Sequence, residues 1–189
     1  MCEVNTSYDQ VMKQLRNQGE VEGDYVERIL DQWRRELPDL DMSPVGIVGR
    51  VYRLARVFEK RLGSTFESQG LNRSGFDVLA SLRRAGQPHR LSPTALYNSL
   101  LITSGAMTNR IDRLEEEGLV TREPSPDDRR ALLVALTPKG KELVESIATE
   151  LAQAEHELLA SLGASEQKEL ATLLRTLLNS LEREDPIPY

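Results

Sequence analysis

The 189-residue sequence has little cysteine, little histidine and no long apolar run. Its only cysteine is Cys2, which excludes an intrachain disulfide and gives no sign of an oxidising compartment. His89 and His156 are far apart and have no neighbouring cysteine, which argues against a zinc site, and we expect His89 to face solvent in its loop. No segment approaches the ~20 apolar residues that span a bilayer. The sequence therefore predicts no metal and no membrane association.

Motifs for targeting and catalysis are missing as well. Residues 1–24 lack the apolar central run of a signal peptide, so we expect a cytoplasmic protein. There is no Gly-rich phosphate loop, no nucleophile elbow and no paired catalytic motif with supporting context. The sequence predicts that the chain is not an enzyme and uses no cofactor.

The apolar content is modest. Hydrophobic residues make up 39% of the chain and charged residues 29%, whereas about 45–50% apolar residues is typical of globular domains. An exposed apolar face fits this balance only if a partner subunit buries it. The length suits one main domain with an appended segment, because single domains usually run to about 100–200 residues.

Charge is distributed unevenly along the chain. The net charge is -6, but residues 45–140 hold 15 basic side chains against 10 acidic ones, while both ends are acidic. Between residues 80 and 114 a single acid, Asp112, is accompanied by five arginines: Arg83, Arg84, Arg90, Arg110 and Arg113. Electrostatic fields decay within about 8 Å at physiological salt. A local basic segment can therefore bind phosphates in an acidic protein.

Apolar residues at helical spacing predict seven helices. They cover about 25–37, 44–70, 74–84, 93–100, 103–117, 138–162 and 165–181. Ser74, Ser92, Thr137 and Ser165 are the candidate N-caps, and Gly118 is expected in the left-handed conformation after the fifth helix.

Between the fifth and sixth helices the period changes to that of strands. Residues 119–122 and 131–136 read as two short strands, joined by the polar segment 123–130. Two short helices followed by a small hairpin predict a winged helix-turn-helix, whose second helix lies in the major groove of DNA. We expect this DNA-binding lobe to span residues 71–136, preceded by an N-terminal extension over residues 1–44.

The predicted recognition helix has one polar side. Opposite Met107, Ile111 and Leu114 it carries four candidate DNA-binding residues: Ser104, Thr108, Asn109 and Arg113. Arginine matches the two acceptors of guanine and asparagine those of adenine. Arg113 has a second interpretation, an ion pair with Glu116 or Glu117 within the helix.

Five segments together resemble the MarR family of regulators in order and spacing. They are LSPTAL (91–96), GAMTNRIDRLE (105–115), GLV (118–120), DDRR (127–130) and LTPKG (136–140), within a match that covers roughly residues 45–182. The resemblance implies a mainly α fold with a β-hairpin wing and an intertwined helical homodimer. Residues 45–70 and 137–183 would form the dimerisation helices. Each subunit would engage half of a palindromic double-stranded DNA operator.

The resemblance also assigns roles in the wing. Arg129 and Arg130 would reach the minor groove or the DNA backbone, and Asp128 would restrain the loop through an ion pair. The alternative is that the two arginines are ordinary exposed loop charges.

The helix around Trp33 precedes the usual family core and resembles the extra helix of a subgroup that responds to urate or small organic acids. By position, Trp33, Asp77 and Arg110 are the implied ligand-binding residues. Trp33 has the alternative of anchoring its own helix. For Arg110 a DNA contact, an ion pair with Asp77 and a link to the ligand all stay open.

These observations predict a ligand-responsive transcriptional regulator, a repressor released from its operator by a small anionic or aromatic effector. The alternative is a winged-helix module that binds proteins rather than DNA. Such modules usually lose the basic wing, whereas Arg122, Arg129 and Arg130 are present here.

Overall fold

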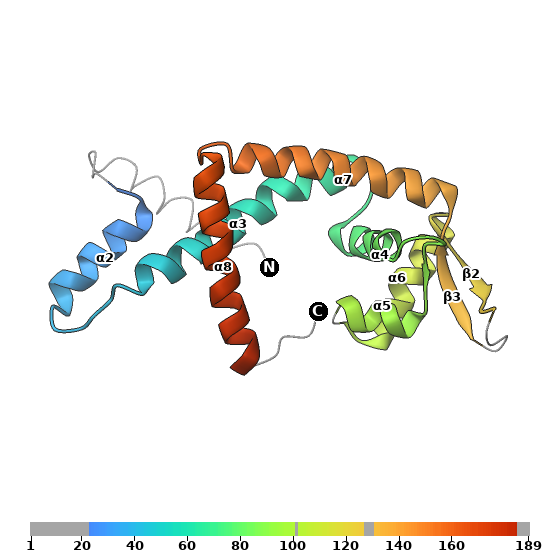
Figure 1. Ribbon diagram of the computed structural model, residues 1–189, viewed down its shortest axis with the longest axis horizontal. Helices are drawn as coiled ribbons and strands as arrows, with labels where there is room; N and C mark the ends of the chain where they lie inside the picture. Colours follow the sequence, from blue (N-terminus) through green and yellow to red (C-terminus); the bar gives the residue numbers. More distant parts are fainter. Residues whose placement is uncertain (1–22, 101, 127–130, 185–189) are drawn as a thin grey trace, which may run out of the picture. The chain divides into compact units, whose positions relative to one another are not determined.

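The computed structural model describes residues 23–100, 102–126 and 131–184. Within these ranges it contains seven helices and a three-stranded antiparallel sheet, which confirms the predicted fold class (Figure 1). The chain divides into two compact units between Val57 and Phe58. None of the helices in the described ranges combines the length and apolar character needed to cross a membrane.

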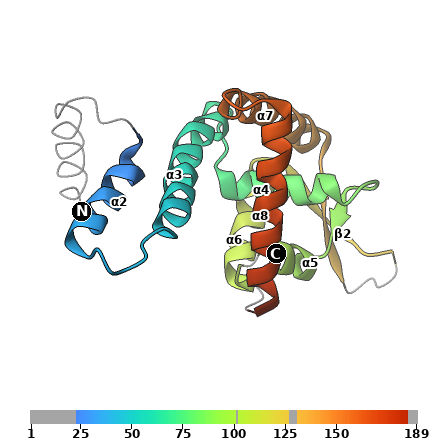
Figure 2. The same ribbon diagram turned by 60° about the vertical axis from the view of Figure 1, so that its left-hand side comes forward.

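The first unit is built from helix α2 (Tyr25–Glu36) and the beginning of helix α3 (Val45–Ser68), joined by a turn that Figure 2 shows clearly. Val26 and Leu30 are the buried residues of α2. A Cβ atom at Gly49 would lie 3.2 Å from Val26 Cγ1. The glycine therefore lets α2 pack closely on α3.

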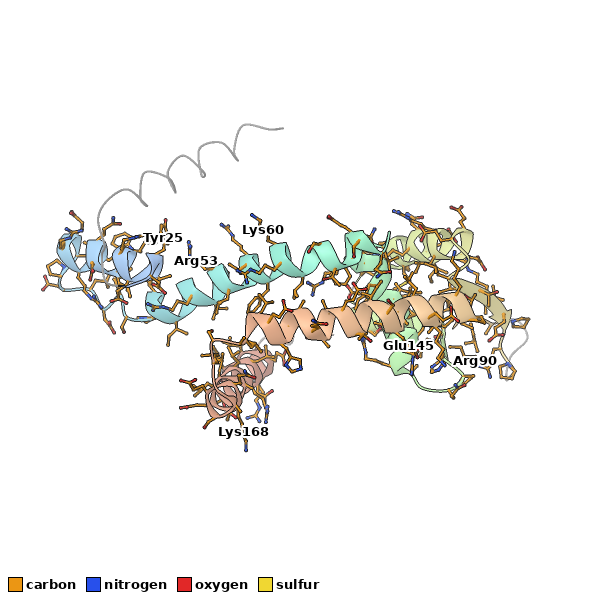
Figure 3. All side chains as sticks on the ribbon, turned by 90° about the horizontal axis from the view of Figure 1, so that it is seen from above. Tyr25, Arg53, Lys60, Arg90, Glu145 and Lys168 are labelled. Atoms are coloured by element: carbon orange, nitrogen blue, oxygen red, sulfur yellow. The ribbon has the colours of Figure 1, made fainter. Side chains whose placement is uncertain are left out.

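Charged contacts fix α2 against α3. The Arg50 guanidinium reaches Asp24 at 2.8 Å and Glu27 at 3.1 Å. The Tyr25 ring lies beside Arg53, whose Cζ is 4.4 Å from the ring centroid (Figure 3). The N-terminal helix that periodicity predicted is thus attached to α3 by both apolar and ionic contacts.

The second unit contains the helix-turn-helix. It consists of α4 (Arg73–Arg84), α5 (Pro93–Leu100) and α6 (Ser104–Glu116). The Ser92 hydroxyl accepts a hydrogen bond from the Ala95 amide and caps α5, as predicted. Thr103 caps α6 in the same way. Both helices begin where a hydroxyl replaces the missing backbone acceptor.

The predicted cap of α4 was wrong by two residues. Asn72, and not Ser74, is the N-cap, and its Oδ1 accepts from the Gly75 amide at 2.8 Å. Asparagine caps as well as serine does, and Ser74 lies in the first turn of α4.

Three short strands form the sheet: β1 (Arg90–Leu91), β2 (Val120–Pro124) and β3 (Leu132–Leu136) in the order β1-β3-β2. The β2–β3 hairpin confirms the predicted wing strands, with Val120 opposite Leu136. Strand β1 was not predicted. Two residues are too few to show an alternating pattern, so only pairing with β3 reveals this strand.

Two long helices complete the unit, α7 (Pro138–Leu158) and α8 (Ala164–Glu184). The predicted end of α7 near Leu162 was four residues too late. The Gln167 side-chain amide donates to the carbonyls of Leu159 and Leu162 at 3.2 and 2.9 Å. These two hydrogen bonds satisfy the backbone carbonyls that would have accepted from backbone amides if α7 had continued.

The predicted N-cap of α8 was also wrong. The Glu166 carboxylate accepts from the Gly163 amide at 2.7 Å, the return half of a capping box. Ser165, the expected cap, lies inside the first turn.

The core of the second unit joins the helix-turn-helix to the sheet and to α7. Figure 1 shows α4, α5 and α6 gathered beside β2 and β3 near the start of α7. The largest fully buried side chains there are Val78, Leu79, Leu82, Leu96, Met107, Ile111, Val134, Val144 and Ile147. The helix that is predicted to read DNA is therefore held by the main core.

One glycine governs how closely α7 approaches the base of the wing. A Cβ at Gly140 would lie only 1.9 Å from the backbone oxygen of Leu119. The Thr137 hydroxyl donates to the carbonyl of Gly118 at 2.8 Å, and Lys139 Nζ donates to that of Glu117 at 2.7 Å. The end of α6 and the start of α7 thus meet backbone to backbone.

Replacing Gly140 by alanine should lower the free energy of unfolding by about 3 kcal/mol, because backbone atoms cannot rotate away from the added methyl group. Urea unfolding at a fixed protein concentration measures this change. Gly105→Ala is the matched control, since a Cβ there meets no atom within 4 Å. Equal stability of the two variants would contradict the close approach.

Candidate nucleic-acid interface

The exposed side of α6 carries the four polar residues that the sequence predicted for it: Ser104, Thr108, Asn109 and Arg113. On the opposite side, Met107, Ile111 and Leu114 are 1–2% exposed. Among the described residues, the polar side of α6 is therefore not packed into the core, and it is exposed enough to enter a DNA groove.

Arg113 takes part in an ion pair. Its Nε lies 3.0 Å from Glu117 Oε1, one turn further along α6, and its side chain is 66% exposed. Of the two predicted partners, Glu116 and Glu117, the structure selects Glu117. An exposed pair at this spacing stabilises a helix by only about 0.3–0.5 kcal/mol. The pair is thus weak enough for a phosphate or a base to displace the carboxylate.

Arg110 and Asp77 influence each other without forming an ion pair within 4 Å. Burial raises the pKa of the Asp77 carboxyl above its usual range, while the positive charges of Arg73, Arg110 and Arg84 act in the opposite sense. Half-buried Asp77 therefore lies in the field of three guanidinium groups. The ion pair was one of three alternatives for Arg110, and the other two stay predictions.

The third predicted ligand residue, Trp33, lies on α2 in the first unit. Its side chain is 40% exposed. It does not belong to the buried residues that attach α2 to α3, which are Val26 and Leu30. A ligand site shared by Trp33, Asp77 and Arg110 stays a prediction.

A charged cluster connects α6 to the wing. The Arg122 guanidinium on β2 donates to Asp112 and to Glu115, both on α6. The other carboxylate oxygen of Glu115 accepts from the Arg122 amide at 3.0 Å. Burial opposes the charge of Arg122, but these carboxylates outweigh it and hold its pKa above the usual value. Arg122, which the sequence analysis counted with Arg129 and Arg130 as a basic residue of the wing, thus points at α6.

This cluster was not predicted, although the sequence contains a signal for it. Asp112 and Glu115 are three residues apart and so share one side of α6, and an arginine follows after a tight turn at Gly118, whose φ is +69°. The positive φ confirms the expected left-handed conformation. Because the turn sends β2 back along α6, the arginine meets both acids.

The tip of the wing lies outside the described residues. Asp128, Arg129 and Arg130, the predicted wing contacts, are in this segment. The strands on either side are described, and Ser125 donates its amide to the carbonyl of Ala131 at 2.8 Å. The roles of the three residues stay predictions.

The arginine-rich segment is less positive in the folded chain than in the sequence. Arg83 pairs with Glu145 of α7 at 2.8 Å, and Arg90 pairs with Glu123 of β2 at 3.4 Å. These acids come from outside residues 80–114. With Arg113 paired to Glu117, Arg84 on α4 and Arg110 on α6 are the arginines of this segment that form no ion pair within 4 Å among the described residues.

His89 does not face solvent, contrary to the prediction from its loop. Its side chain is 7% exposed and its φ is +58°. Its carbonyl accepts from the Leu136 amide at 3.1 Å, at the start of β1. Pairing of β1 with β3 draws the residue into the protein, which a sequence pattern around a two-residue strand does not reveal.

A pocket of about 230 Å³ opens between the start of α4 and the second half of α6. Asn72 and Ser74 line it from the start of α4, and Asn109, Arg110, Arg113 and Glu117 line it from α6 and its C-cap. Asn109 and Arg113, predicted to bind DNA, and Arg110, predicted for DNA and for ligand, are thus brought together in one pocket. No set of three or more potential metal ligands occurs among the residues that the structure describes.

Comparison with known proteins agrees with this arrangement. Residues 69–131 match the model of the MarR family. The HTH-type transcriptional regulator PecS of Dickeya dadantii is 35% identical over 158 residues, which cover 84% of this chain and 93% of PecS. The multiple antibiotic resistance protein MarR of Salmonella typhimurium is 33% identical and covers 73% of this chain, with 93% of its own length matched.

A solved structure is similar as well. It is a mutant MarR from E. coli complexed with operator DNA, which is 28% identical, has a TM-score of 0.59 and covers 77% of this chain and 97% of its own. The relatives are transcriptional regulators, in agreement with the prediction that the chain is not an enzyme. By sequence identity along most of its length and by its winged helix-turn-helix, the chain belongs to the MarR family of transcriptional regulators.

Proposed function

We propose that the protein is a DNA-binding repressor that acts as a homodimer on a palindromic operator and is released by a small effector. The observation that carries the proposal is the polar, exposed side of α6, presented by a core-anchored helix beside a wing. The related MarR is seen in complex with operator DNA. In this proposal α6 enters the major groove, and the segment with Arg129 and Arg130 contacts the DNA backbone or the minor groove.

Dimerisation is supported by an apolar surface on α8. Its leucines are 36–61% exposed and recur at helical spacing: Leu170, Leu173, Leu174, Leu177, Leu178 and Leu181. A soluble monomer rarely exposes a large apolar patch, so such a patch on a single chain indicates a surface that binds a partner. We assign residues 45–70 and 137–183 to dimerisation, residues 71–136 to DNA binding, and residues 1–44 to an N-terminal extension.

The dimer matters because it sets the distance between two recognition helices. Half-sites read on one face of DNA lie about 34–36 Å apart, or a multiple of this distance. A ligand that binds more tightly to a dimer whose subunits are rotated would move the two recognition helices away from the spacing of the half-sites. To change the ratio of rotated to DNA-binding dimers from 1:99 to 99:1, the ligand must bind the rotated state more tightly by about 5.5 kcal/mol. Trp33, Asp77 and Arg110 are the residues that we propose for such a ligand.

The first test is to select bound sequences from a random pool of DNA duplexes and to measure their affinity at two salt concentrations by fluorescence anisotropy. We expect a palindrome whose affinity falls steeply with salt, because each neutralised phosphate releases counterions. No enriched sequence and no salt dependence would instead favour a winged-helix module that binds proteins.

The cluster around Arg122 gives a second prediction. Arg122→Gln should weaken operator binding about tenfold or more, because it frees the wing from α6 and leaves two unpaired carboxylates beside the DNA-facing helix. Anisotropy measures the affinity, and circular dichroism confirms the fold. Arg83→Gln is the control, since it removes an exposed ion pair with Glu145 on α7. Equal effects of both variants would contradict a positioning role of Arg122.

The apolar surface of α8 gives a third prediction. Leu173→Glu with Leu177→Glu should reduce the mass in solution from twice 21.3 kDa to 21.3 kDa, because buried charges oppose association. Light scattering after gel filtration measures the mass. Thr172→Glu with Thr176→Glu adds the same charges to the opposite side of α8. If the threonine variant dissociates and the leucine variant does not, the interface lies on the threonine side of α8, and the proposal that the leucines form it is wrong.

A further inference from the structure

Gly105 lies on the exposed side of α6, in the first turn of the helix that is proposed to read DNA. We propose that the missing side chain of Gly105 sets how closely α6 approaches the base edges in the major groove, which makes Gly105 a positioning residue for sequence recognition. The inference rests on the proposed function, because it concerns the same surface of α6.

Most glycines of the described chain have a reason within the fold. Some adopt a positive φ: Gly23, Gly70, Gly86 and Gly118. At others a Cβ atom would lie 3.2 Å or less from a neighbouring atom: Gly23, Gly49, Gly75 and Gly140. At Gly105 neither reason applies, because its φ is not positive and a Cβ there would meet no atom within 4 Å. Gly63 is the other described helical glycine of which this is true, and it lies among the residues proposed for dimerisation.

A glycine inside a helix is unfavourable without such a reason. Glycine loses more conformational freedom on folding than any other residue, and alanine is the better helix former. Since α6 begins at Ser104 after its cap Thr103, Gly105 is the second residue of the helix. The chain by itself would thus be at least as stable with alanine at this position. The benefit of glycine therefore lies in a contact that α6 makes outside the single chain.

The position of Gly105 on α6 indicates which contact this is. Residues three and four apart are neighbours on the surface of a helix, so Gly105 lies beside Thr108 and Asn109. All three are exposed, whereas Met107 and Ile111 on the other side are 1% exposed. In helix-turn-helix proteins the N-terminal residues of the recognition helix contact base edges. A side chain at position 105 would therefore come between α6 and the DNA.

The two neighbours of Gly105 can contact bases only at short range. The Thr108 hydroxyl donates to the carbonyl of Ser104 at 3.0 Å. Its single proton is therefore used within α6, and Thr108 offers DNA its methyl group and the lone pairs of its oxygen. Asn109 has a short side chain, and it forms paired hydrogen bonds with adenine only in direct contact with the base edge. Both residues thus require the backbone of α6 to lie close to the bases.

Phosphate contacts depend less on this distance. The Arg113 side chain is 66% exposed, and its only ion pair among the described residues is the weak one with Glu117. A long arginine side chain can follow a small outward displacement of the helix. Phosphate contacts support binding to any sequence, whereas base contacts support the preference for one sequence. Filling position 105 should therefore lower the affinity for the operator much more than the affinity for an unrelated duplex.

The test compares Gly105→Ala and Gly105→Leu with the wild-type protein, all as the full chain. Anisotropy gives the Kd for the selected duplex and for an unrelated duplex of the same length, at constant ionic strength. Thermal unfolding, followed by circular dichroism at a fixed protein concentration, reports on the fold. Ser43→Thr is the matched control, because it also adds one methyl group to an exposed residue, and Ser43 lies outside the residues proposed for DNA binding and for dimerisation.

We expect Gly105→Ala to raise the Kd for the selected duplex about tenfold or more, as the loss of one good base contact would. The Kd for the unrelated duplex should rise by less than about threefold, because the phosphate contacts persist. Gly105→Leu should bring the two Kd values close to each other. The unfolding midpoint of Gly105→Ala should equal or exceed that of the wild type, since alanine favours the helix. Ser43→Thr should change neither Kd.

Several results would overturn the inference. If Gly105→Ala keeps the wild-type ratio of the two Kd values, the residue does not set the distance to the bases. If alanine and leucine have equal effects, the freedom of the backbone matters and the size of the side chain does not. A lower unfolding midpoint of Gly105→Ala would make the glycine a structural residue. In each of these cases the wild-type protein still binds the selected duplex, whereas a wild-type protein that binds no DNA would overturn the proposed function as well.

Discussion

The link between Arg122 and the two acids of α6 decides where the wing lies. A two-stranded hairpin is marginally stable by itself, and this one is held by strand β1, by the buried side chains of Val120 and Val134 and by its link to α6. Asp112 and Glu115 hold the guanidinium, and Glu115 also accepts from the backbone of the same arginine. The hairpin is therefore bound to α6, and the two parts proposed to contact DNA are joined by charged hydrogen bonds.

The same junction is tied from the other side by α7. Thr137 and Lys139 donate to the carbonyls at the end of α6, and the missing side chain of Gly140 lets the backbones touch. The long helix α7 starts at this point, so its first turn packs directly against the base of the wing. It thereby joins the wing to the residues that we propose for dimerisation.

The pocket between α4 and α6 lies on the proposed reading surface itself, because Asn109 and Arg113 line it together with Arg110. Its two arginines differ in their surroundings. Arg113 pairs with Glu117, which lines the pocket as well, whereas Arg110 forms no ion pair within 4 Å among the described residues. Burial raises the pKa of the nearby Asp77 carboxyl, and the charges of Arg73, Arg110 and Arg84 oppose this shift.

Local patterns in the sequence determined the helices, the two long wing strands, the turn at Gly118 and the two sides of α6, because each depends on residues within a few turns of one another. The tertiary structure alone decided the rest. Strand β1, the burial of His89, the acids that neutralise Arg83 and Arg90, and the direction of Arg122 all depend on partners distant in sequence. The spacing of residues along a chain predicts helices and strands, but it does not predict which charged side chains the fold brings together.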